Sequence, residues 1–204
     1  MKVIKITVLL AVLMLFGTYA YAVDCNTGAR YEDNNSNGTV TDCRTGLVWL
    51  KDAACSDQAG GVTPTAGELT WYDAMKWAAG LYGGTISTPG PCNLTDGSSA
   101  GDWRLPTKTE WMAMVAYAKK QTYSPTLTND AGTAVWASGT GSAFTNVQAY
   151  SYWSSTTDAN STDFAWLVYM GNGSMNNAYL KSNNVYIWPV RGGRAGSFGS
   201  VRIE

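Results

Sequence analysis

Asp102-Trp103-Arg104-Leu105-Pro106-Thr107-Lys108-Thr109-Glu110 is the most informative segment of the sequence, because it leads from a loop into a helix with a defined start. Thr107 and Glu110 have the T-x-x-E spacing of a capping box, in which two side chains satisfy free backbone N–H groups of the first turn. The residues that follow place four apolar side chains on one helix face: Trp111, Met114, Val115 and Ala118. We expect Trp103 to pack in the core and Arg104 to tie loops together, with ligand contact as the alternative for both.

A second amphipathic segment lies upstream of this stretch. Thr70 and Asp73 resemble a capping box, and Gly83-Gly84 provides a stop signal. This pattern predicts a helix over residues 70–81. Its apolar face is expected to contain Trp71, Ala74, Met75, Ala78 and Leu81.

From Tyr123 onward, short apolar runs alternate with turn residues, a pattern that is typical of strands. The run Phe164–Met170 is apolar at both alternating positions, which favours a central strand covered on both faces. Gly171–Ser174 predicts a hairpin turn after it, and Pro189 indicates an edge or a bulge in the last strand. The candidate strands are 46–51, 134–137, 152–156, 163–170, 178–181 and 185–191. Two helices followed by a strand-rich half predict an α+β domain.

The composition excludes several classes of function. The 204 residues include no histidine, so Ser-His-Asp and Cys-His catalysis and HExxH zinc sites are excluded. The formal net charge is −1, without the basic excess typical of nucleic-acid binders, so we expect no nucleic-acid partner. Charged residues make up 14% of the chain, against a usual ~25%, which favours a secreted, loop-rich or β-rich domain.

Residues 1–22 have the pattern of a secretory signal peptide. Lys2 and Lys5 precede the apolar run Val8–Phe16, and Ala20-Tyr21-Ala22 supplies a small-x-small cleavage site. A membrane anchor is the alternative, but the apolar run is shorter than the ~20 residues of a spanning helix. We therefore predict export without a transmembrane anchor after cleavage, a domain over 23–193 and a polar tail over 194–204. The final location is extracellular, at the cell surface or periplasmic.

Four cysteines all lie in the first half of the chain: Cys25, Cys43, Cys55 and Cys92. An even number in an exported chain favours disulfides, for which three pairings exist. We favour Cys25–Cys43 and Cys55–Cys92, because each closes a local loop. A metal site or redox pair is the alternative, although no C-x-x-C spacing supports it.

Calcium is the one cofactor that the sequence suggests. The candidate ligands are Asp33, Asn35, Asn37 and Asp42. The first three, with Gly38, match positions 1, 3, 5 and 6 of an EF-hand-like loop. Arg44 stands at position 12 in place of the bidentate glutamate, and Asp42 is a substitute ligand. The alternative is an Asx-rich turn closed by hydrogen bonds from side chains to the backbone.

Five segments along the chain together resemble one known family. They are Val40-Thr41-Asp42 with Thr45-Gly46-Leu47-Val48-Trp49, Asp102–Glu110, Tyr152-Trp153-Ser154-Ser155-Thr156, Ala165-Trp166-x-Val168 and Val190-Arg191-Gly192-Gly193. In this order they resemble the Legionella collagen-like adhesin C-terminal domain family, from about Arg30 to Gly193. The resemblance implies a C-type-lectin-like fold, with two helices flanking a small twisted antiparallel sheet with long loops. It also implies an extracellular binding or adhesion role.

The adhesin that names this family is associated with sulfated glycosaminoglycans. This chain departs from it, since it has no Gly-x-y stalk. Without Lys2 and Lys5 the mature chain has 12 basic and 15 acidic residues, a net charge of −3. The sequence leaves open whether the protein forms a homo-oligomer.

The segment Asn172–Asn184 is the predicted contact surface for a ligand. Its amide, aromatic and cationic groups suit sugar hydroxyls or protein surfaces, and a solvated hairpin is the alternative. The candidate ligand-binding residues are Asn172, Asn176, Asn177, Tyr179, Lys181, Asn183 and Asn184, with Trp136 and Tyr150 from neighbouring loops. We expect Trp153, Trp166 and Trp188 to be core residues.

The predicted function is that of a secreted, non-catalytic ligand-binding or adhesion module for glycans or another surface polymer. The alternative is a structural or protein-binding subunit of an extracellular surface assembly. We expect no enzyme, because no spacing singles out a pair of catalytic carboxylates and no cysteine follows Cys92.

Overall fold

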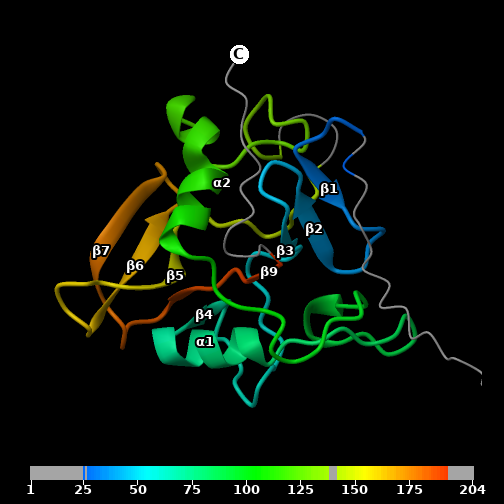
Figure 1. The fold of residues 1–204 in the computed structure, drawn as a ribbon, viewed down its shortest axis with the longest axis horizontal. Coiled ribbons are helices and arrows are strands. Elements are labelled where there is room, and N and C mark those ends of the chain that lie inside the picture. The colour runs from blue at the N-terminus through cyan, green and yellow to red at the C-terminus, as the bar shows by residue number, and fades with distance from the viewer. Residues whose placement is uncertain (1–24, 26, 138–141, 193–204) are drawn as a thin grey trace, which may run out of the picture.

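The computed structural model describes residues 25, 27–137 and 142–192 (Figure 1). The predicted signal peptide, 1–22, and the predicted tail, 194–204, lie outside these residues. The described chain forms two α-helices, a short 3₁₀ turn and nine strands in two sheets. None of the helices in the described ranges is both long and apolar enough to cross a membrane.

The first sheet has four antiparallel strands in the order β1-β2-β3-β9. Three of them are consecutive in the chain: β1 (Tyr31–Asp33), β2 (Thr39–Asp42) and β3 (Leu47–Leu50). The fourth, β9 (Val190–Arg191), comes from the end of the described chain and pairs Val190 with Trp49 of β3. The predicted strand over 46–51 is confirmed as β3.

The second sheet has five strands in the order β4-β8-β5-β6-β7. Its strands are β4 (Glu68–Leu69), β5 (Ser151–Thr157), β6 (Phe164–Tyr169), β7 (Ser174–Leu180) and β8 (Val185–Tyr186). As predicted, β6 is an inner strand, and the turn after it folds the chain back as the antiparallel β6–β7 hairpin. The β5–β8 pair is parallel, and the other pairs in this sheet are antiparallel.

The prediction of one small antiparallel sheet is therefore wrong, although the α+β class is correct. The predicted strand 185–191 is split, because Ile187, Trp188 and Pro189 carry the chain from β8 in one sheet to β9 in the other. Proline has no N–H for a strand ladder, which suits this crossing. The predicted strand 134–137 is also wrong: Val135 forms an isolated bridge to Thr128, outside the nine strands.

The two helices pack on the five-stranded sheet. In Figure 1, α2 (Lys108–Lys120) stands beside β5 and β6, and α1 (Trp71–Ala79) lies across the end of the molecule that holds β4. Both predicted N-caps are confirmed, with Thr107 capping α2 and Thr70 capping α1. The buried face of α2 is the predicted one. The buried face of α1 is rotated from the prediction, and consists of Ala74, Trp77 and Ala78.

Trp188 lies at the centre of an aromatic core. Its ring centroid is 5.4 Å from Trp49 of β3, 6.0 Å from Trp111 of α2, 5.6 Å from Tyr152 of β5 and 4.9 Å from Phe144. These distances are in the range of favourable edge-to-face and offset ring pairs. Trp188 therefore joins both sheets and α2 in one core.

The stretch 102–110 connects this core to the start of α2. Trp103 is buried, as expected, and its indole N–H donates to Ser98 Oγ at 2.9 Å. The backbone of Arg104 exchanges two hydrogen bonds with Val190. Its guanidinium donates to both carboxylate oxygens of Glu110, at 2.8 and 2.6 Å. Because Glu110 also accepts from the backbone N–H of Thr107, one carboxylate serves the helix cap and the loop clamp together.

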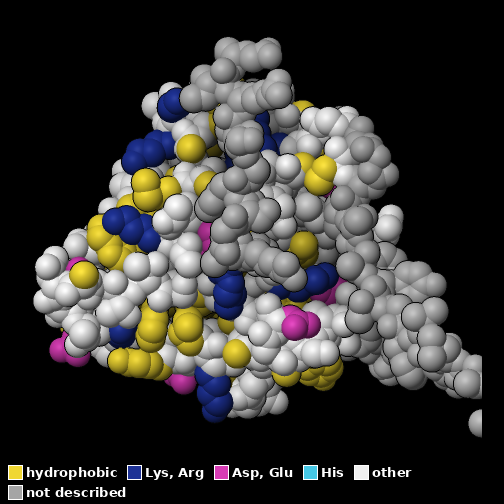
Figure 2. All heavy atoms as spheres, in the orientation of Figure 1, with side chains coloured by type: hydrophobic (Ala, Val, Ile, Leu, Met, Phe, Trp, Pro, Cys, Tyr) yellow, Lys and Arg dark blue, Asp and Glu magenta, His cyan; other side chains and the backbone are white. Residues whose placement is uncertain are grey.

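Trp166 differs from the prediction that it is core. It is half-buried, and the Lys108 ammonium lies 3.2 Å from the centre of its ring. Both neighbouring strands lose their regular pairing opposite this residue, so β-bulges flank it on either side. Bulges re-aim side chains and disrupt regular pairing. Figure 2 shows basic side chains (Lys and Arg) and hydrophobic side chains close together over the region of α2.

We predict that Glu110→Gln destabilises the protein by about 1.5–3 kcal/mol, the usual contribution of hydrogen bonds to a charged group. The Arg104 and Thr107 hydrogen bonds outweigh the opposing effect of burial and lower the pKa of Glu110. A lowered carboxyl pKa adds stability above the ordinary pKa of ~4.3, and this stability is lost as the pH falls through the folded-state value. Urea unfolding at pH 7 and pH 3 measures both effects.

Glu68→Gln is the control, because Glu68 is half-buried in a strand and belongs to no ion pair among the described residues. We expect the Glu110 variant to lose its disadvantage at low pH. An equal loss of stability in both variants would contradict the stabilising role of the Arg104–Glu110 ion pair.

Candidate functional site

The residues of the predicted ligand surface are spread along the whole length of β7. Asn172 lies in the β6–β7 turn, whereas Asn183 and Asn184 follow the other end of the strand. A strand of seven residues spans roughly 23 Å at ~3.3 Å per residue. Asn177 donates to Asp158 Oδ2 at 3.3 Å, and Asn172 accepts from the backbone N–H of Ser174 at 2.9 Å. The structure therefore does not gather these asparagines into one site.

Lys181 is the predicted residue with the most unusual surroundings. Only 6% of its surface is exposed. Its ammonium donates to Thr157 Oγ1 at 3.0 Å and lies 4.1 Å from the ring centre of Trp71 and 5.5 Å from that of Tyr72. Within the described ranges no carboxylate forms an ion pair with it. Burying a cation without a counter-charge costs free energy, and aromatic faces offset part of it.

The start of α1 and the end of β5 hold these groups together. The backbone N–H of Trp71 donates to the Lys181 carbonyl at 2.9 Å, and its indole N–H donates to the Ser154 carbonyl at 2.8 Å. Tyr72 is 63% exposed and meets Trp71 edge-on at 5.2 Å between ring centres. We call Trp71, Tyr72, Thr157 and Lys181 the Lys181 cluster. It presents an exposed aromatic ring with a buried cation behind it.

A second aromatic feature lies near the start of β5. Tyr150, a predicted contact residue, is 61% exposed and stacks on Tyr186, with 6.1 Å between ring centres and 12° between planes. Burial, the Glu68 carboxylate and Tyr150 raise the pKa of Tyr186. Tyr179, also predicted, is partly exposed on β7 and lies 5.8 Å from the buried Trp153.

Sequence reasoning missed three contributors to these features: Tyr72, Thr157 and Tyr186. Tyr72 had a usable signal, because it lies beside the apolar face of a predicted helix and so had to be exposed. Thr157 and Tyr186 had none, because the β5–β6 pairing places Thr157 and the parallel β5–β8 pairing places Tyr186.

Trp136 makes its contacts in a different part of the molecule from the Lys181 cluster and the Tyr150–Tyr186 pair. It is half-buried against the main core. Its backbone N–H donates to the Leu127 carbonyl at 2.9 Å, and its indole N–H donates to the Phe144 carbonyl at 3.4 Å. These contacts give Trp136 a packing role in the described part of the segment between α2 and β5.

The candidate calcium loop forms the β1–β2 turn. Asp33 Oδ1 accepts from the Ser36 N–H at 3.0 Å, and Oδ2 forms an ion pair with Lys51. Asn37 Oδ1 accepts from the backbone and the hydroxyl of Thr39 at 3.1 and 2.7 Å. These are the contacts of the Asx-rich turn, which was the alternative interpretation.

The other two candidate ligands are differently placed. Asn35 is exposed and has φ 56°. Asp42 is fully buried at the far end of β2, where it accepts from the Arg44 N–H at 3.0 Å and pairs with Arg30 at 3.5 Å. Calcium binding is untested, and these internal bonds compete with it for the same oxygen atoms.

A small polar hollow of about 250 Å³ opens beside this turn. Its lining residues include Ser36, Gly38, Lys51, Asp52 and Asn93. Gly38 has φ 84°, and a Cβ on it would lie 2.8 Å from the Asn93 carbonyl oxygen, so the turn needs glycine here. The charged groups of the hollow are already engaged: Lys51 pairs with an aspartate, and Asp52 accepts from an amide and a backbone N–H.

We expect Ca²⁺ to leave the thermal midpoint unchanged relative to EDTA, because the oxygens of Asp33 and Asn37 already accept hydrogen bonds within the turn. Differential scanning fluorimetry measures this. A rise of several degrees that Asp33→Asn removes would instead establish the calcium site.

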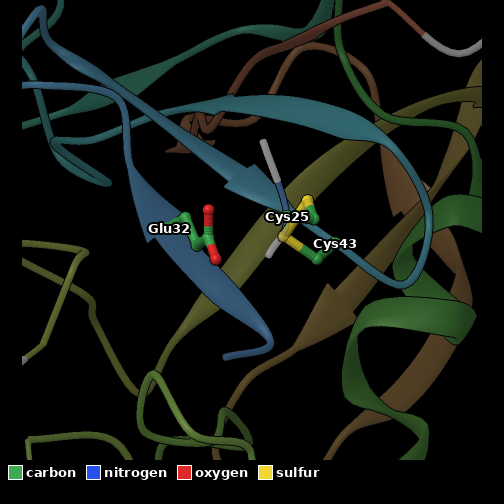
Figure 3. Close-up of side chains that lie close together, drawn as sticks. All are labelled: Cys25, Glu32 and Cys43. Atoms are coloured by element: carbon green, nitrogen blue, oxygen red, sulfur yellow. A yellow bond between two sulfur atoms is a disulfide. The ribbon is translucent and has the colours of Figure 1, made fainter. Parts of the chain in front are cut away.

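The four cysteines form the two predicted disulfides. Cys25 pairs with Cys43 and Cys55 with Cys92, with Cα–Cα distances of 5.7 and 5.8 Å. Each pair lies close to a carboxylate, as Figure 3 shows for Glu32 beside the first. Sulfur joined in a disulfide is not a thiolate and so does not serve as a strong metal ligand. The geometry favours structural crosslinks over a metal site.

We predict that replacing both Cys55 and Cys92 by serine lowers the free energy of unfolding by about 3–4 kcal/mol, because the bond closes a 37-residue separation. Urea unfolding of the oxidised proteins measures the loss. The Cys25/Cys43 double serine variant is the control, with a smaller expected loss because its separation is 18 residues. A larger loss in the control would contradict this ranking.

These features define a disulfide-bonded α+β module with an exposed aromatic surface. The family model described as the Lcl C-terminal domain matches residues 38–191, so the chain belongs to this family. The match confirms the resemblance found in the sequence. The family suggests an adhesin-like extracellular module, and the two disulfides fit an exported protein. No curated protein matches the chain.

Proposed function

We propose that this chain is a non-catalytic extracellular module that binds a glycan or another surface polymer through the Lys181 cluster. One observation carries the proposal: Lys181 is 94% buried behind the exposed ring of Tyr72, without an ion-pair partner in the described part of the chain. A cation held in this way costs stability. A role in binding a ligand would explain why a buried lysine is present at this position.

The chemistry of the cluster suits sugars. The face of an exposed tyrosine packs against the C–H face of a sugar ring at low cost in side-chain entropy. The Lys181 ammonium has three donors, of which Thr157 Oγ1 takes one, so sugar hydroxyls or an acidic substituent can accept from the others. The tyrosine pair, Tyr150 and Tyr186, offers a second aromatic surface of the same kind.

The absence of a catalytic role and the C-type-lectin-like fold are parts of the same proposal. Two helices packed on strands joined by long loops are compatible with that fold. In such a scaffold, loops held by a rigid core carry binding residues.

We predict that Tyr72→Ala and Lys181→Met each weaken binding of the glycan that the wild type selects from a panel of neutral and acidic oligosaccharides. The expected loss is tenfold or more, ~1.4 kcal/mol, because each variant removes a central contact. Calorimetric titration measures it. Tyr82→Ala is the matched control, because Tyr82 is also exposed but lies in the loop after α1.

Equal affinity of the Tyr72, Lys181 and Tyr82 variants would move the site away from the Lys181 cluster. If no oligosaccharide of the panel binds the wild type and a Tyr72-dependent protein partner is captured instead, the protein-binding alternative replaces glycan binding. Thermal midpoints of all variants establish that each one is folded.

A further inference from the structure

Five asparagines of the described chain stand in Asn-x-Ser/Thr triplets, the acceptor pattern for N-linked glycosylation. They are Asn34, Asn37, Asn93, Asn160 and Asn172. The pattern alone is common in a chain so rich in asparagine and serine. The structure distinguishes the five, because a transferase needs an accessible triplet and an acceptor side-chain amide that is not already held by hydrogen bonds.

Three of the triplets have an engaged acceptor side chain. Asn34 Nδ2 donates to Thr39 Oγ1 at 2.7 Å and to Thr41 Oγ1 at 3.0 Å. The side-chain oxygens of Asn37 and Asn172 accept backbone N–H groups of their own turns. Each of these asparagines stabilises its turn through the amide that a transferase would have to extract.

The triplet at Asn93 is exposed only at its first residue. Asn93 follows the disulfide-bonded Cys92 and has φ 59°. The middle residue, Leu94, is fully buried. The Thr95 N–H donates to the Asn37 carbonyl at 3.0 Å. A transferase cannot surround a triplet whose middle residue lies in the core.

The triplet Asn160-Ser161-Thr162 lies in the loop between β5 and β6. Asn160 and Thr162 are exposed, Ser161 is half-exposed, and the flanking Ala159 and Asp163 are exposed. The backbone N–H of Asn160 donates to Asp158 Oδ1 at 3.1 Å. Among the described residues, the side-chain amide of Asn160 has no hydrogen-bond partner. The amide is therefore accessible to a transferase.

We propose that Asn160 is an acceptor for an N-linked glycan. Nδ2 of Asn160 forms a bond to the anomeric carbon of a sugar carried on a lipid pyrophosphate. The bond from that carbon to the pyrophosphate oxygen breaks, and the lipid pyrophosphate leaves with the electron pair. One Nδ2 proton passes to a base of the transferase, and no oxidant or reductant is needed.

A glycan at Asn160 would border the Lys181 cluster. The same loop supplies the Asp163 carbonyl, which accepts from the Lys181 backbone N–H at 2.9 Å, and it begins directly after Thr157. The modification thus adds a hydrophilic group beside the proposed binding surface. The acceptor assignment itself does not depend on that function.

The test is export of the full chain into a bacterial periplasm that contains a bacterial oligosaccharyltransferase and a lipid-linked oligosaccharide of known mass. Intact mass and peptide mapping are the readouts. We expect one glycan, on the peptide that contains Asn160, and its complete loss in Asn160→Gln and Thr162→Ala. Unchanged thermal midpoints show that these exposed substitutions leave the fold intact.

Asn34 is the matched internal control. Glu32 stands two residues before it, as Asp158 stands two residues before Asn160, so the two triplets share a preceding carboxylate. They differ in the engagement of the side-chain amide. Occupancy at Asn34 or Asn93 equal to that at Asn160 would overturn the proposal. So would an unmodified chain in cells where a co-exported acceptor protein is glycosylated.

Discussion

The packing of Trp188 against four other rings unites both sheets and α2 in one core. Its indole N–H donates to the Leu50 carbonyl at 2.7 Å, so the side chain is tied to β3 as well as packed on it. Because Trp188 lies between β8 and β9, its burial requires the chain to leave the five-stranded sheet and enter the four-stranded one. The burial of Trp188 therefore links the two sheets.

The clamp made by Arg104 extends this core outward. Its backbone pairs with Val190, two residues after Trp188, while its side chain reaches the cap of α2. With the sheets and α2 held in this way, the loops at the ends of β5, β6 and β7 start from rigid positions. The Lys181 cluster and the Asn160 loop both lie there, at the outer end of β5.

How much of the fold could be predicted from the sequence depends on how far apart in the chain the interacting residues lie. The capping box at Thr107 and Glu110 and the β6–β7 turn were predictable, since each rests on residues close in sequence. The sequence favoured the two disulfides that form but left three pairings open. The rotated face of α1 was not predictable, because the loop that carries Asp57 covers Trp77 and accepts its indole N–H at 2.8 Å. The periodicity of apolar residues shows that a helix has an apolar face. Tertiary packing determines which residues lie at the centre of that face.

The order of residues along the chain was enough to establish the family, the α+β class and the helix starts, because caps and turns are chosen by nearby residues. For the cysteines it favoured one of three pairings. The packing of distant segments decided that residues 185–191 are shared between two sheets. It also decided that Lys181 is buried behind Tyr72, and that Asn34 is engaged whereas Asn160 is exposed. These outcomes depend on distant segments that pack together, and no local pattern records which of them will meet.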